Sequence, residues 1–139
     1  MKTLCITLMV LFMTISFTSC KKEASEVDPD FANRVAGRYS LSKFELGGTS
    51  YKISDTYYTG SMEVRRESAA SVMLIMDVKG RNNAQFLDGT VTGVTLTDVG
   101  NGELSLMKDG NNLGRGGNNT LAIRGVDTQG DSFVITGKK

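Results

Sequence analysis

Few residues in this chain could carry out chemistry. The sequence contains no histidine, so the commonest general base and the commonest metal ligand are both missing. The densest charges run from Glu63 to Glu67, and two carboxylates can act as acid and base where they face each other across a site. On one strand, however, Glu63, Arg65 and Glu67 share a face, which indicates a solvated surface. We therefore expect no enzymatic activity, no metal and no cofactor.

Two loops have the composition of ligand-binding motifs but lack their defining residues. The segment GNNLGRGGNN (110–119) is followed by no Lys-Ser/Thr pair and no helix, so a polar hairpin loop is a better interpretation than a phosphate-binding loop. Asp127 and Asp131 lack the EF-hand spacing and its terminal Glu, and a turn with Asx hydrogen bonds fits them better. Lys+Arg number 16 and Asp+Glu 15, which gives no reason to expect a nucleic acid partner.

The two cysteines, Cys5 and Cys20, lie within or just after an apolar segment. The segment LCITLMVLFMTISF (4–17) follows Lys2 and contains no charged residue. Its 14 residues are too few for a membrane-spanning helix, which needs about 20, and suit the core of a signal peptide, about 7–15. The alternative is a buried first helix of the domain, which should show a polar face that this segment lacks.

Residues 17–20, Phe-Thr-Ser-Cys, resemble the lipobox of bacterial lipoproteins of the Bacteroidetes type, with Phe17 in place of the usual Leu. The resemblance implies that residues 1–19 are removed as a signal peptide. It also implies that Cys20 carries a diacylglycerol and an acylated amino group, palmitate being a typical chain. Lys21, where retained lipoproteins have Asp, implies the outer membrane by the same resemblance. Both the periplasmic and the surface face fit this pattern.

Cleavage before Cys20 would leave 139 − 19 = 120 residues with Cys20 as the only thiol, so no disulfide could form within the chain. Residues 20–33 are predicted to be the lipidated cysteine and a polar tether, because this segment has four acidic residues, one proline and little apolar surface. Residues 34–139 are then one domain, and at this size a hydrophobic core alone can stabilise it.

From Val35 onward, apolar residues alternate as they do in β-strands, and no segment has a convincing helical period. Phase slips near Ser42–Lys43 and at Gly93 predict β-bulges. We predict an all-β fold, a single antiparallel meander β-barrel of about eight strands; a β-sandwich is the alternative, and bent strands favour the barrel. The clearest strand segments are 37–46, 61–67, 71–79, 90–99, 103–109, 119–126 and 131–138.

The segment VAGRYSL (35–41) resembles the first strand of lipocalin-like, or calycin-like, domains. These begin with Gly, a variable residue and an aromatic residue, here Gly37, Arg38 and Tyr39, although the aromatic residue is usually Trp and this chain has none. By the same resemblance, SFVITGKK (132–139) closes the barrel by pairing with the first strand. Together with the anchor that the lipobox implies at Cys20, this resemblance implies a membrane-anchored, non-catalytic binding module whose interior takes a small apolar or amphipathic ligand.

Interior positions and the segment SYKISDTYYTG (50–60) supply the candidate binding residues. The tyrosines of this segment could cap a cavity or pack at a barrel end, and both arrangements fit. Arg66 is in phase with Met62 and Val64, so it could close the barrel mouth or meet an anionic head group, unless the strand ends before it. The predicted ligand-binding residues are Tyr39, Leu41, Tyr57, Tyr58, Met62, Val64, Arg66, Leu74 and Met76.

A second function fits the same sequence. Eight-stranded barrels can be filled by their own side chains, and an envelope lipoprotein with a filled barrel would bind a protein or glycan through its surface. Met73 and Ile75, on the outer face of a strand that is apolar on both faces, favour this alternative. An interior cavity of ligand size separates the two functions, because only the first requires one.

Replacing Cys20 by Ser should leave the barrel folded and release the protein from membranes, because we interpret the cysteine as an attachment point and not as part of the fold. Cell fractionation with immunoblotting measures this. Cys5→Ser is the matched control and should remain membrane-bound, since Cys5 lies in the segment that is removed. Recovery of the Cys20→Ser protein in the membrane fraction would contradict the anchor.

Overall fold

The structure is a computed structural model that describes residues 29–139. The predicted signal peptide, Cys20 and most of the predicted tether lie outside the described residues. No helix among the described residues is long and apolar enough to span a membrane. The elements are α1 (Phe31–Val35), β1 (Gly37–Leu46), β2 (Thr49–Lys52), the 3-10 turn η1 (Ile53–Asp55), β3 (Thr59–Arg66), β4 (Ser71–Lys79), the 3-10 turn η2 (Arg81–Asn83), β5 (Gln85–Gly100), β6 (Glu103–Lys108), β7 (Asn111–Gly117), β8 (Thr120–Val126) and β9 (Ser132–Lys138).

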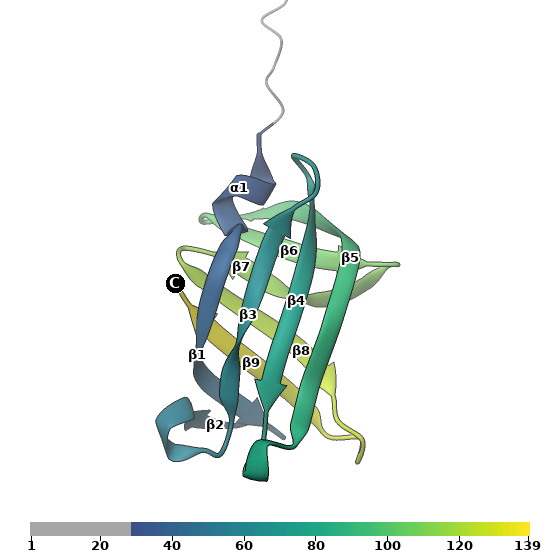
Figure 1. The fold of residues 1–139 in the computed structure, drawn as a ribbon. Coiled ribbons are helices and arrows are strands. Elements are labelled where there is room, and N and C mark those ends of the chain that lie inside the picture. Colours follow the sequence, from purple (N-terminus) through teal and green to yellow (C-terminus); the bar gives the residue numbers. More distant parts are fainter. Residues whose placement is uncertain (1–28) are drawn as a thin grey trace, which may run out of the picture.

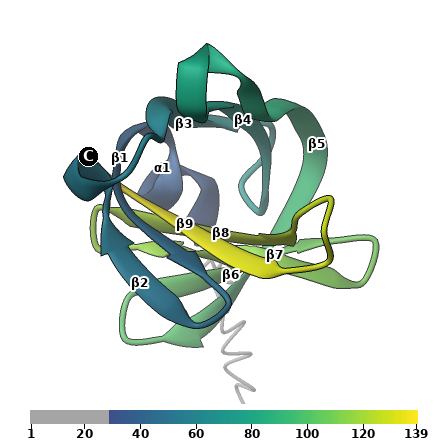
Figure 2. The ribbon, with the colours of Figure 1, turned by 90° about the horizontal axis from the view of Figure 1, so that it is seen from below.

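The strands form a closed antiparallel β-barrel (Figures 1 and 2). Each strand from β3 to β9 pairs with its neighbour in the chain, and β1 pairs with β9 to close the sheet. β1 also pairs with β3 through residues 37–40 and with β2 through residues 43–46, so β2 is an extra strand beside an eight-stranded barrel. The predicted meander barrel is therefore confirmed, and the sandwich alternative is wrong.

Both predicted β-bulges are present. The register of β1 against β9 shifts between Leu41 and Lys43. In β5, Val91 lies opposite Leu74 and Val94 lies opposite Val72, so β5 has one residue more than β4 in this interval. Gly93 lies within the bulge with a φ of 63°, a left-handed conformation that glycine adopts without steric cost. The bulges bend β1 and β5 and so help the sheet to close.

The segment 110–119 is a strand and not the loop that we expected. β7 fills most of it and pairs with both β6 and β8. A Cβ on Gly114 would lie 2.0 Å from the carbonyl oxygen of Ala122, so the close approach of β7 and β8 requires glycine at this position. The glycines that suggested a loop therefore allow β7 to pair with β8. Because glycine has no side chain, β7 lacks the apolar–polar alternation by which a strand is recognised.

A short helix, α1, covers one end of the barrel, at the top of Figure 1. Asp30 caps it: one carboxylate oxygen accepts a hydrogen bond from the backbone N–H of Asn33 (3.1 Å), and the other accepts from Nε of Arg66 (3.1 Å). Arg34 pairs with Asp98 of β5 at 2.8 Å, and this hydrogen bond lowers the pKa of Asp98. Residues 31–33, which we placed in the tether, therefore belong to the folded domain.

The half of the barrel next to α1 is solid. Ala32 and Val35 of α1 are fully buried, and the hydroxyl of Tyr39 donates a hydrogen bond of 2.6 Å to the carbonyl oxygen of Val35. Burial raises the pKa of Tyr39 to about 12. Over the whole barrel, the strand side chains that are completely or almost completely buried are Tyr39, Phe44, Met62, Val64, Val72, Leu74, Val78, Val94, Leu96, Leu104, Leu106, Leu121, Ile123, Phe133 and Ile135.

Replacing Tyr39 by Phe should reduce the fall in the free energy of unfolding at alkaline pH. Tyrosine ionises near pH 10 in an unfolded chain, whereas the pKa of Tyr39 in the folded barrel is about 12. The contribution of Tyr39 to the free energy of unfolding is therefore complete below about pH 10 and is lost as the pH rises towards 12. Urea unfolding of wild-type and Tyr39→Phe protein across this range measures the difference.

At neutral pH, Tyr39→Phe should be less stable than wild type by about 1 kcal/mol, since the buried carbonyl of Val35 loses its donor. Tyr57→Phe is the control, because 65% of Tyr57 is exposed, and it should follow the wild-type decline. Parallel curves for wild type and Tyr39→Phe above pH 10 would contradict the assignment.

Candidate ligand-binding cavity

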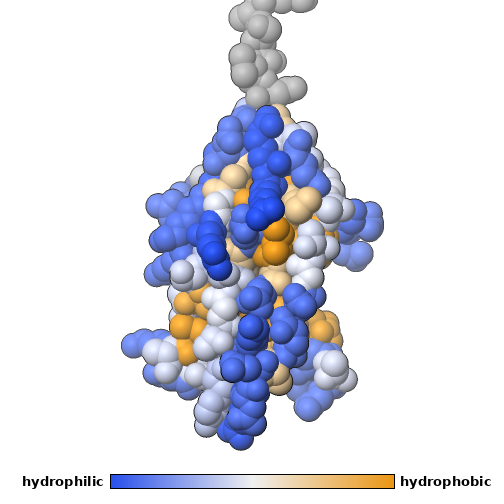
Figure 3. Space-filling view, viewed as in Figure 1, coloured by the Kyte–Doolittle hydropathy of each residue, from blue (hydrophilic) through white to orange (hydrophobic). Residues whose placement is uncertain are grey.

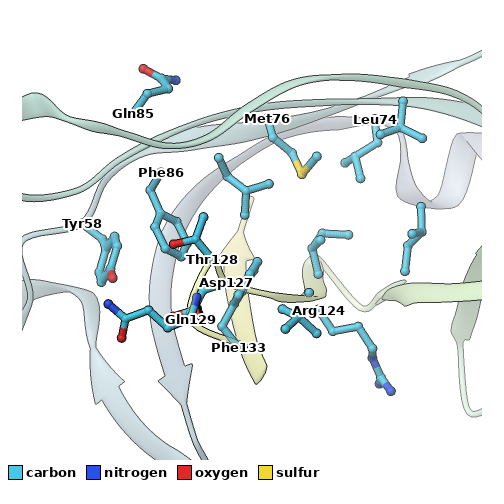
Figure 4. Close-up of a pocket in the computed structure, with 16 residues that line it drawn as sticks. Tyr58, Leu74, Met76, Gln85, Phe86, Arg124, Asp127, Thr128, Gln129 and Phe133 are labelled. Carbon is cyan, nitrogen blue, oxygen red and sulfur yellow. Dashed lines mark hydrogen bonds between the residues drawn. The ribbon is translucent and has the colours of Figure 1, made fainter. Parts of the chain in front are cut away.

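The half of the barrel away from α1 is hollow. It contains a cavity of about 590 Å³, within the range of small-molecule sites (Figure 4). Its walls come from β4, β5, β7, β8 and β9, from the β8–β9 turn and from Tyr58, which precedes β3. The lining residues are Tyr58, Leu74, Met76, Gln85, Phe86, Leu87, Val91, Leu113, Ile123, Arg124, Gly125, Val126, Asp127, Thr128, Gln129 and Phe133.

An aromatic cluster forms one end of the cavity. Phe86 contacts Tyr58 edge to face, with ring centroids 4.9 Å apart, and contacts Phe133 at 5.2 Å. Phe44 packs beside them, with its ring centroid 4.1 Å from that of Tyr58 and the two rings tilted by 33°. The four rings come from β1, β5, β9 and the loop before β3, so their contacts join these segments beside the cavity.

Phe86 reaches the cavity because of a third register shift, which the sequence did not reveal. Val78 lies opposite Leu87 and Lys79 lies opposite Gln85, so Phe86 is an extra residue on β5. Phe86 and its neighbour Leu87 both line the cavity, although adjacent residues of a regular strand face opposite sides. The bulge thus turns two consecutive apolar residues inward.

The polar lining residues lie at the edges of the cavity. In the β8–β9 turn, one carboxylate oxygen of Asp127 accepts hydrogen bonds from the backbone N–H groups of Gln129 (2.9 Å) and Asp131 (2.8 Å), so the predicted Asx turn is present. Burial, and then the negative charge of Asp127, raise the pKa of Tyr58. Arg124 lies apart from this turn, and its guanidinium points away from Asp127 (Figure 4).

The cavity meets the outside along two strand edges that have no strand partner among the described residues. β5 pairs with β6 only from Thr95 onward, which leaves the edge of Gln85–Val94 free on that side. β8 pairs with β7 only through Thr120–Ile123, which leaves Arg124–Val126 free. Residues of both edges line the cavity. We call the space between Gln85–Val94 and Arg124–Val126 the lateral gap.

The structure brings only part of the predicted site together. Tyr58, Leu74 and Met76 line the cavity. Tyr57 lies outside it, with the guanidinium carbon of Arg81 4.3 Å from its ring centroid. Of the other predicted residues, Tyr39, Met62 and Val64 are buried in the core, and Leu41 is half-buried against it. Arg66 donates a hydrogen bond to Asp30, the residue that caps α1.

Several lining residues were missed by sequence reasoning. Leu113 lay in the presumed loop, Phe86 and Leu87 precede the strand segment that we recognised, and Ile123, Arg124 and Phe133 lay in recognised strands with no signal that a cavity adjoins them. Within residues 29–139, no group of three or more Cys, Asp or Glu side chains is close enough to hold a metal ion.

Comparisons with known proteins support the fold alone. No family model matches the sequence, and the search of curated proteins found no match. A crystal structure from Bacteroides fragilis NCTC 9343, described as a "putative outer membrane protein", is similar with a TM-score of 0.50 and 21% identity over 79% of this chain. This chain spans about half of that one, 53%. A de novo designed fluorescence-activating β-barrel is similar with a TM-score of 0.47 and 10% identity, over 79% of this chain and 97% of the designed one.

Replacing Gly125 by Ala should shrink the cavity. The new Cβ would lie 2.6 Å from Cζ of Phe133, so the ring must move, and its contact with Phe86 must change with it. We expect the free energy of unfolding to fall by about 1–2 kcal/mol, as for other overpacked cores. Chemical denaturation measures this change.

Gly80→Ala is the matched control. A Cβ there meets the ring of Tyr58 at 3.6 Å, an ordinary contact, so the same added methyl group should change the free energy of unfolding little. Equal stability of the Gly125→Ala and Gly80→Ala proteins would show that Phe133 is not held in place.

Proposed function

We propose that this protein is a non-catalytic binding module whose barrel takes one small apolar or amphipathic ligand, and that lipid on Cys20 holds it at the outer membrane of the cell envelope. The cavity of about 590 Å³ is the observation that carries the binding proposal. A barrel of eight strands can be filled by its own side chains or can hold one small ligand, and the unfilled half of this barrel supports the second arrangement.

The lining favours an apolar or amphipathic ligand. Most of it comes from aliphatic and aromatic side chains, with the polar groups at the edges. Met76, an unbranched and polarisable side chain, can adjust to ligands of different shape. The aromatic cluster of Phe44, Tyr58, Phe86 and Phe133 gives one end a rigid wall. Apolar walls with few polar groups are the usual composition of small-molecule sites.

The alternative, a filled barrel that binds a protein or glycan through its surface, has weaker support. It rested on Met73 and Ile75, which are only half-buried on the outer face of β4. They lie opposite Arg65 and Glu63 of β3, which form an ion pair of 2.7 Å. The face shown in Figure 3 is mostly hydrophilic, with apolar areas between hydrophilic residues. The exposed apolar area is therefore interrupted by charge.

Native mass spectrometry of the protein purified from its own host tests the binding proposal. We expect the wild-type protein to retain a small molecule as an added mass. Val91→Phe should lose that mass, because Val91 lines the cavity and a phenyl group would occupy the volume. Val99→Phe is the control: it lies on the same strand, outside the cavity, and is 44% exposed.

Two outcomes would overturn the proposal. A wild-type protein with no added mass and no uptake of supplied fatty acids would exclude a ligand of this class. An added mass that Val91→Phe and Val99→Phe retain equally would place the small molecule elsewhere on the protein.

A further inference from the structure

We propose that the ligand is a single-chain amphiphile with an anionic head group, whose apolar chain fills the cavity while its head group leaves the barrel through the lateral gap and binds Arg124. This inference rests on the proposed binding function and adds the class of ligand and the route that it takes.

Arg124 is the one positively charged side chain among the cavity-lining residues that the structure describes. It is exposed, and it makes no ion pair within residues 29–139. Arg115, two residues after the lining residue Leu113, pairs instead with Glu103 on the outer face at 3.4 Å. A planar guanidinium beside an apolar cavity is suited to a carboxylate or phosphate, which it can bind with two parallel hydrogen bonds.

The acidic residue of the lining does not compete for Arg124. Asp127 lies three residues further along, about 10 Å for an extended chain. One of its carboxylate oxygens is used by the two backbone N–H groups of the β8–β9 turn. Figure 4 shows the guanidinium of Arg124 pointing away from that turn. An anion at Arg124 is therefore kept apart from the negative charge of Asp127.

The lateral gap supplies the rest of the head-group site. The edges Gln85–Val94 and Arg124–Val126 have backbone N–H and C=O groups that no described strand pairs with. Such edges are open to hydrogen bonds from a ligand. On the inner side of the gap, Phe86, Val91 and Leu113 are apolar. The polarity thus changes from apolar to cationic across the gap, as an amphiphile requires.

Photo-crosslinking in isolated membranes that contain the full chain tests this proposal. The probes are a diazirine-bearing sixteen-carbon fatty acid and the uncharged alcohol of the same chain, with crosslinked peptides located by mass spectrometry. In wild type we expect the acid to label cavity residues more strongly than the alcohol. Arg124→Gln should reduce labelling by the acid about tenfold and leave labelling by the alcohol unchanged. Arg115→Gln, which removes one positive charge outside the cavity, should change neither.

A second pair of variants tests the route. Val126 is 67% exposed and shares a strand face with Arg124, so Val126→Glu should neutralise the guanidinium and weaken labelling by the acid. Gln129→Glu adds the same charge in the β8–β9 turn and should have a smaller effect. A larger effect of Gln129→Glu would overturn the lateral route.

The remaining outcomes separate this inference from the proposed function. Equal labelling by acid and alcohol, unaffected by Arg124→Gln, would overturn the head-group site and leave cavity binding intact. Absence of cavity labelling by both probes would overturn the proposed function and this inference with it.

Discussion

The cavity and the lateral gap of this barrel both depend on a mismatch in length between neighbouring strands. β5 has 16 residues, whereas β6 has 6 and β7 has 7. The β6–β7 hairpin ends at Asp109 and Gly110, which both have positive φ, as a tight two-residue hairpin turn requires. Had β6 continued beside residues 85–94 of β5, its inward side chains would have occupied the interior. The early Asp-Gly turn therefore leaves both the cavity and the lateral gap.

The two halves of the barrel differ because only one has an extra element to fill it. Ala32 and Val35 of α1 are buried at the end of the barrel where β6 and β7 pair with their neighbouring strands. A Cβ on Gly116 would lie 3.0 Å from Val35, so glycine in β7 makes room for the helix. This same strand carries too few inward side chains to fill the other half. Glycine in β7 thus lets α1 fill one end of the barrel, and no such element enters the other end.

The sequence predicted the strands and bulges that show in the alternation of apolar side chains. It did not predict the glycine-rich strand or the cavity, which leave no such pattern. Alternation identified most strands, and the phase slips at Ser42–Lys43 and Gly93 located two bulges correctly. β7 has almost no apolar alternation, so its pairing could not be recognised from periodicity. The cavity depends on how far β6 and β7 extend beside β5. The pairing register of these strands is set in the folded sheet and cannot be read from the sequence of one strand. Hence Tyr58, Leu74 and Met76 were found and Phe86 and Arg124 were not.

The position of α1 also constrains how an anchored barrel would work. The described chain begins beside α1, so a lipid on Cys20 would be joined to the solid end of the barrel, and the hollow half is the end farther from that attachment (Figure 1). The interval from Cys20 to Asp30 spans at most about 35 Å when fully extended. An amphiphile bound with its head group at Arg124 would therefore lie in the half of the barrel farther from the attachment point, with its chain shielded from water. Such an arrangement suits a protein that receives its ligand from the aqueous side and does not need to draw it out of the membrane beneath.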